Sequence, residues 1–163
     1  MAIYILPNFL TPAECEEVKS LFPPSKPATI NVEGGFAAVH AHRRGRVAFL
    51  ETTPAVSVRI RELIDSVNDR IFHFEIKDVE SLQLAQYAVQ DNYDWHLDIG
   101  HGKAGVRKVS ATIKLSDAAD YDGGDLEIKG SGKIDRAQGT IILFPSYLLH
   151  RVTPVTRGLR HAL

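Results

Sequence analysis

The chain has 163 residues, of which 44% are hydrophobic and 24% are charged, which is typical of a folded globular domain and excludes a disordered or fibrous chain. Nineteen basic and twenty acidic residues give a net charge of -1, which disfavours a nucleic-acid binder that works by bulk positive charge. A single cysteine excludes an intrachain disulfide framework, and the lack of a long apolar run or a basic-then-apolar start predicts a cytoplasmic protein.

The segment 1–73 is expected to form a helical support for the rest of the chain. Residues 3–6 are a short apolar run that predicts a strand. Thr11 and Glu14 have the spacing of a helix N-terminus, in which Thr11 is the N-cap and Glu14 completes a capping box. A second helix is predicted over residues 53–71, because apolar side chains recur there every three or four positions.

From residue 74 onward the pattern changes to short strands separated by turns. Alternating or β-branched residues predict strands over 82–87, 106–115 and 140–144, with turns rich in Gly and Asp between them. Short strands at this spacing are typical of a sandwich or a barrel. We therefore expect a single domain over 1–163 of the α+β class, mostly β, with about eight strands in 74–163 and two helices packed on one outer face of the sheets.

A candidate metal site lies inside this β-rich half. His96 and Asp98 are two positions apart, so in a strand their side chains project from the same face. A third ligand is expected from His150, which follows an apolar strand and a Pro turn. Two His and one carboxylate on one face of an octahedron leave three positions open, which is the arrangement used by non-haem Fe(II) oxygenases.

A candidate carboxylate clamp follows the third ligand. Arg160 comes ten positions after His150, where a strand that runs back would bring its guanidinium close to the metal. Arginine grips a carboxylate through two parallel hydrogen bonds, and Tyr87, on the strand that leads to His96, would add a phenolic one. The site therefore requires a ligand with a chelating keto-acid at one end and a carboxylate at the other. 2-Oxoglutarate fits this description.

Four segments resemble the iron/2-oxoglutarate dioxygenases of prolyl 4-hydroxylase type, and above all the small PKHD-type hydroxylases of bacteria and phage. They occur in the order expected for that family and cover about half of the chain, at residues 87–98, 107–116, 121–128 and 144–160. The resemblance implies a double-stranded β-helix (a cupin-like jelly-roll) with its catalytic core in 74–163. It also implies Fe(II) held by His96, Asp98 and His150, and 2-oxoglutarate held by Arg160 and Tyr87, with Thr112 as a further member of the cosubstrate pocket.

The resemblance implies a hydroxylase that uses Fe(II), 2-oxoglutarate and O2, with ascorbate as a supporting reductant, and that releases succinate and CO2. The favoured substrate is a proline side chain in a peptide or protein. The alternatives are the same chemistry on a free amino acid or other small molecule, and a cupin-like module that binds metal or ligand without turnover. Nucleic acid is a disfavoured partner, and no membrane association is expected. Family members usually continue past the arginine strand, whereas this sequence ends at Leu163, a difference expected to affect the substrate more than the chemistry.

Other conspicuous residues are given structural roles. The basic cluster at 40–46 is interpreted as a solvated surface, with contact to substrate as the alternative. Tyr121 and the glycines at 123 and 124 are interpreted as turn-forming residues. Five of the seven histidines are left without a role in the metal site.

Overall fold

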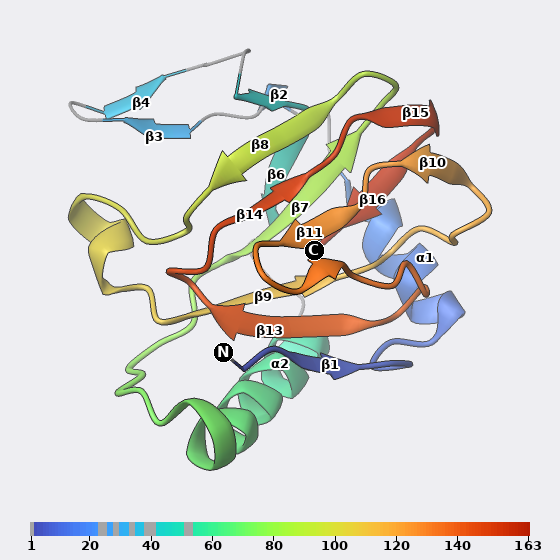
Figure 1. Cartoon of the computed structure of the whole chain (residues 1–163). Coiled ribbons are helices and arrows are strands. Elements are labelled where there is room, and N and C mark those ends of the chain that lie inside the picture. Colours follow the sequence, from blue (N-terminus) through green and yellow to red (C-terminus); the bar gives the residue numbers. More distant parts are fainter. Residues whose placement is uncertain (1, 23–25, 28–29, 33–34, 38–41, 51–53) are drawn as a thin grey trace.

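The fold is taken from a computed structural model, which describes residues 2–22, 26–27, 30–32, 35–37, 42–50 and 54–163 (Figure 1). The helical elements are α1 (Pro12–Ser20), α2 (Pro54–Val67), the π-helical turn η1 (Asn68–Phe72) and the short 3-10 helix η2 (Gly102–Val106). The strands are β1 (Tyr4–Leu6), β2 (Lys26–Pro27), β3 (Ile30–Val32), β4 (Gly35–Ala37), β5 (Arg43–Arg44), β6 (Arg46–Leu50), β7 (Leu82–Tyr87), β8 (Asn92–His96), β9 (Val109–Ile113), β10 (Tyr121–Gly123), β11 (Leu126–Ile128), β12 (Gly132–Lys133), β13 (Ile141–Pro145), β14 (His150–Val152), β15 (Val155–Gly158) and β16 (Arg160–Ala162).

The two predicted helices are present, and local sequence explains how each begins or ends. The Thr11 backbone N–H donates to the Glu14 carboxylate at 2.7 Å, and the Glu14 N–H donates to the Thr11 hydroxyl at 3.2 Å, which completes the capping box. Beyond α2 the predicted helix continues as the π-helical η1, which ends at His73 in the left-handed conformation (φ 56°). The Asn68 side chain fixes this end, because its amide donates to the Phe74 carbonyl and accepts from the Phe74 N–H, both at 2.9 Å.

The strands form layers that bring distant parts of the chain together (Figure 1). The larger sheets have the strand orders β12-β11-β14-β8-β5, β16-β7-β6-β2 and β1-β13-β9, and the smaller ones are β10-β15 and β3-β4. The N-terminal segment contributes strands as well as helices, since β6 extends the sheet of β7 from Arg46↔Gln86 to Leu50↔Leu82. The predicted helical support is therefore partly β, because these five residues gain a ladder partner far along the chain.

The main hydrophobic core lies between the helices and the outer side of the β9–β13 layer. Ile60 and Ile64 of α2 and Val18 of α1 pack in one cluster with Ile113 and Ile141, which are paired across β9 and β13. Side chains at the intervening positions of these strands point to the other side of the layer, where Ile142 and Phe144 form a second cluster with β11. The alternation therefore gives β9 one face toward the helices and one toward the interior between the sheets.

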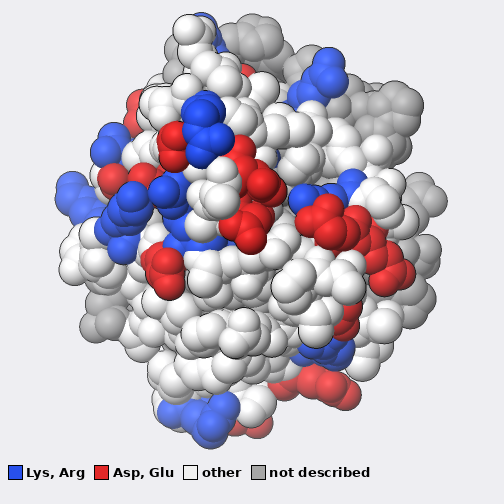
Figure 2. Space-filling view, turned by 90° about the vertical axis from the view of Figure 1, so that its right-hand side faces the viewer, with Lys and Arg blue, Asp and Glu red and all other residues white. Residues whose placement is uncertain are grey.

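Charged residues of both signs are interspersed on the side of the molecule that carries α1 and β10 (Figure 2). The ion pair between Arg157 and Asp122, at 2.6 Å, joins β15 to β10 there. In the described part of the chain, no helix is long and apolar enough to cross a membrane.

Candidate metal and cosubstrate site

The predicted metal ligands meet where β14 pairs with β8. The ladder places His150 directly opposite His96, and Asp98 follows just after β8 ends. The Nε2 atoms of His96 and His150 lie 3.6 and 3.4 Å from the two carboxylate oxygens of Asp98, and one ligand atom from each of the three residues lies within 4.8 Å of the others. Strand register thus brings together three residues that are up to 54 positions apart in the chain.

Hydrogen bonds fix the orientation of both imidazole rings. The Nδ1 atom of His96 lies 2.7 Å from the Asp94 carbonyl, and that of His150 lies 2.8 Å from the Leu148 carbonyl. A carbonyl oxygen only accepts, so each Nδ1 carries the proton and each Nε2 presents its lone pair toward Asp98. Burial, together with the nearby His150, lowers the pKa of His96 to about 4, so the ring is neutral at physiological pH.

Ser110 of β9 holds the carboxylate of the triad. Its hydroxyl donates to Asp98 Oδ2 at 2.5 Å and lies 3.0 Å from the Ser146 hydroxyl, while the Asp98 N–H donates to the Ser146 carbonyl at 3.1 Å. The Tyr93 ring stacks on His96, with 3.4 Å between ring centroids. Sequence reasoning missed Ser110 and Ser146, although Ser110 is two positions from Thr112 and therefore shares its face of β9.

Replacing Ser110 by alanine is expected to weaken Fe(II) binding by roughly 10- to 100-fold, the usual effect of losing a group that orients a metal ligand. The hydroxyl is the donor that fixes Asp98 Oδ2, and without it the carboxylate is free to rotate. Calorimetric titration of Fe(II) under nitrogen measures the change. Ser131→Ala, at an exposed turn, is the matched control. Equal affinities in the two variants would show that Ser110 does not orient the ligand.

Arg160 lies in the interior of the β structure, where the sequence analysis expects a carboxylate clamp. It pairs with Tyr87 across β16 and β7, and its guanidinium carbon lies 5.1 Å from the centroid of the Tyr87 ring. Only 2% of Arg160 is exposed, and its Nε and Nη1 atoms have no hydrogen-bond partner among the residues that the structure describes. Buried guanidinium N–H groups are costly when unpaired, so this side chain fits an anionic ligand that the protein itself does not provide.

Gly124, which directly follows β10, contributes to the position of Arg160. Gly124 has φ +59°, and a Cβ atom there would lie 2.8 Å from Arg160 Cδ and 3.0 Å from Val155 Cγ2. The buried Tyr121 ring lies close by, where burial raises the pKa of the Tyr121 hydroxyl and the charge of Arg160 partly offsets that rise. The interpretation as turn-forming residues is wrong for Tyr121 and Gly123, because pairing with β15 places them in strand β10, and Gly124 makes room for the arginine.

The remaining predicted residues are less closely tied to the site. Thr112 is half-buried on the Ser110 face of β9, and within the described residues it makes no side-chain hydrogen bond to the triad or to Arg160. In the basic cluster, residues 40 and 41 lie outside the described residues. Arg43 is buried, donates to the Gln83 side chain at 2.8 Å and lies over the Tyr93 ring at 4.5 Å. The expectation of a solvated surface is wrong for this residue, because β5 pairs with β8 and carries Arg43 onto the ring behind His96.

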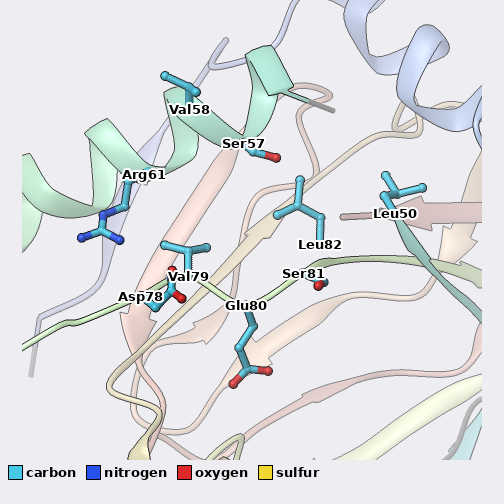
Figure 3. A pocket seen from close by; sticks show the side chains of 9 residues that line it. All are labelled: Leu50, Ser57, Val58, Arg61, Asp78, Val79, Glu80, Ser81 and Leu82. Carbon is cyan, nitrogen blue, oxygen red and sulfur yellow. The ribbon is translucent and has the colours of Figure 1, made fainter. Parts of the chain in front are cut away.

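An open groove of about 330 Å³ lies elsewhere, between α2 and the segment before β7 (Figure 3). It is lined by Leu50, Ser57, Val58, Arg61, Asp78, Val79, Glu80, Ser81 and Leu82. Its link to the metal triad is indirect. Glu80 accepts two hydrogen bonds from Arg107, which also donates to the Asp98 carbonyl at 3.2 Å. None of the predicted site residues lines this groove.

Comparison with known proteins agrees with this geometry. Residues 82–163, half of the chain, match the 2OG-Fe(II) oxygenase superfamily. A PKHD-type hydroxylase of a Synechococcus species is 36% identical over 131 residues, which are 78% of this chain and 59% of the relative. The chain spans between about two fifths and three fifths of the length of this and the next curated relatives, which are also PKHD-type hydroxylases.

Solved structures share the fold along nearly the whole chain. A Trichoplax adhaerens prolyl hydroxylase, solved with a hypoxia inducible factor peptide fragment, has a TM-score of 0.78 at 22% identity, covering 98% of this chain and 80% of its own. A Pseudomonas putida prolyl-4-hydroxylase has a TM-score of 0.74 at 20% identity, covering 98% and 88%. The expected mostly-β jelly-roll fold is confirmed. The family match over the segment that contains the triad and Arg160 settles the classification: the chain belongs to the 2OG-Fe(II) oxygenase superfamily.

Proposed function

We propose that this chain is an Fe(II)- and 2-oxoglutarate-dependent dioxygenase that hydroxylates a proline side chain in a peptide or protein. The observation that carries the proposal is the presence, within one β structure, of a His-Asp-His triad and a buried guanidinium with unpaired N–H groups. The triad provides nitrogen and oxygen ligands suited to Fe(II), and the guanidinium provides the anchor for a dicarboxylate.

In this proposal each residue has a distinct task. His96, Asp98 and His150 would hold the metal from one side, and Arg160 would grip the distal carboxylate of 2-oxoglutarate, with Tyr87 against it and Thr112 farther along the same pocket. When bound, the iron and the cosubstrate supply the O2 chemistry that hydroxylates a C–H bond and releases succinate and CO2. The protein excludes water from the clamp, since both Arg160 and Tyr87 are almost fully buried.

The substrate is proposed from the relatives. Two of the structures that share the fold are prolyl hydroxylases by name, and one of them was solved with a peptide fragment bound. A peptidyl proline is therefore the first substrate to test, and ascorbate belongs in the assay as the reductant that maintains Fe(II).

Succinate release is the test of turnover. The protein is incubated with Fe(II), 2-oxoglutarate, ascorbate and a panel of proline-rich peptides, and mass spectrometry follows the gain of one oxygen atom by the peptide. We expect succinate and hydroxylated peptide in equal amounts. A parallel panel of free amino acids separates peptide hydroxylation from the same chemistry on small molecules. Tight Fe(II) binding without succinate in either panel would contradict the proposal and favour a binding module without turnover.

A further inference from the structure

Lys114 is a second buried cation in the interior that holds Arg160. It directly follows β9, and only 1% of the residue is exposed. Its Nζ atom has no hydrogen-bond partner within the described ranges of the chain. Lysine is almost never fully buried unless it is paired, because removing an ammonium group from water is energetically costly. The proposed metal ligands do not account for this side chain.

The strand register places Lys114 and Arg160 on the same inner face. Lys114 forms an antiparallel bridge with Ala162, and Arg160 is two positions before Ala162, so the two cationic residues are diagonal neighbours. Diagonal neighbours are within reach of each other when their side chains are long. Lys114 also shares its face of β9 with Ser110 and Thr112, because these three residues alternate along the strand. The inner face of β9 therefore runs from the carboxylate of the metal triad to the neighbourhood of the arginine clamp.

Positive charge exceeds negative charge in this interior. Among the carboxylates, that of Asp125 acts most strongly on Lys114, and it already forms ion pairs with Lys133 at 3.0 Å and Arg136 at 3.6 Å, although its buried Oδ1 accepts no hydrogen bond within the described residues. Burial lowers the pKa of Lys114 well below its ordinary value, and the Arg160 charge lowers it further, while Asp125 acts in the opposite direction. An anion placed between Lys114 and Arg160 would restore the charge balance and give the orphaned N–H groups an acceptor.

We propose that Lys114 is a second binding residue for the distal carboxylate of 2-oxoglutarate, which it would grip together with Arg160. The inference rests on the proposed function, since it assumes that this dicarboxylate enters the site. It assigns the two halves of the clamp to different strands: the planar guanidinium comes from β16 and the ammonium from the end of β9.

The test compares two ligands on two variants. 2-Oxoglutarate and 2-oxopentanoate, which has the same chain length but lacks the distal carboxylate, are titrated calorimetrically into Fe(II)-loaded protein under nitrogen. Lys114→Met keeps the length of the side chain and removes its charge, and Lys129→Met, at an exposed position, is the matched control. We expect Lys114→Met to weaken 2-oxoglutarate binding by roughly 10- to 100-fold and to leave 2-oxopentanoate binding unchanged. Should Lys114→Met not fold, Lys114→Gln is measured in its place.

The other outcomes separate the inference from the proposed function. If the unmodified protein binds Fe(II) but not 2-oxoglutarate, the proposed function fails. If it binds 2-oxoglutarate and the Lys114 variant binds it equally well, the inference is overturned and Lys114 belongs to the charge cluster of Asp125. Equal losses for the two ligands would also overturn it, because the lysine would then shape the pocket without contacting the carboxylate.

Discussion

The Asp98→Ala variant is expected to retain no Fe(II) after gel filtration and to release no succinate. The carboxylate lies 3.6 and 3.4 Å from the Nε2 atoms of the two histidines and is the anionic member of the triad. Without it, two imidazoles remain, and a divalent ion loses both a ligand and its charge compensation. His96→Ala is expected to give the same result, since it removes one of those two imidazoles.

Metal content and fold are measured together in this experiment. Elemental analysis gives the bound iron, and circular dichroism shows that the β structure is intact. His101→Ala, in which an exposed histidine outside the triad is removed, controls for the loss of an imidazole. Stoichiometric iron in Asp98→Ala or His96→Ala would overturn the assignment of the metal site.

The Arg160→Ala variant is expected to bind Fe(II) normally and to require at least about 100-fold more 2-oxoglutarate. The guanidinium is buried and its Nε and Nη1 atoms are unpaired, so their role in this proposal is to bind the cosubstrate. Its strand partner is Tyr87 and not a metal ligand, so the triad is expected to keep its geometry. Calorimetry under nitrogen gives the two affinities separately.

Two further substitutions sharpen this experiment. Arg160→Lys keeps a positive charge but loses the planar fork, and we expect it to recover only part of the affinity. Arg157→Ala removes an exposed arginine that pairs with Asp122 on the outer surface, and it is expected to bind 2-oxoglutarate as the unmodified protein does. An unchanged cosubstrate requirement in Arg160→Ala would show that the carboxylate is bound elsewhere.

Local patterns predicted the parts of the fold that depend on neighbouring residues. The capping box at Thr11 and Glu14 requires only four consecutive residues, and the alternation that places His96 and Asp98 on one face requires only three. The proximity of His150 was predicted from the order of motifs, and the structure shows its physical origin in the ladder with β8. The metal-ligand and clamp roles of these residues stay predictions until they are measured.

Features that depend on strand pairing could not be read from the sequence. Arg43 looked like part of a solvated basic cluster, and its burial follows from the pairing of β5 with β8. Ser110 and Lys114 were overlooked for the same reason, since only the register of β9 shows which of its faces looks inward. The sequence nevertheless contains a signal for Lys114, because it stands in an otherwise apolar stretch. A buried ammonium group is unfavourable there unless an anion or a hydrogen-bond acceptor pairs with it.

The pairing of His150 with His96 and of Arg160 with Tyr87 has a consequence for folding. Each pair joins residues more than 50 positions apart, so neither half of the site exists until the sheets have closed. A metal ion that needs all three ligands has no equivalent site in the unfolded chain, and its binding free energy therefore adds to the stability of the folded state. Metal binding therefore reports that the strands carrying the three ligands have paired.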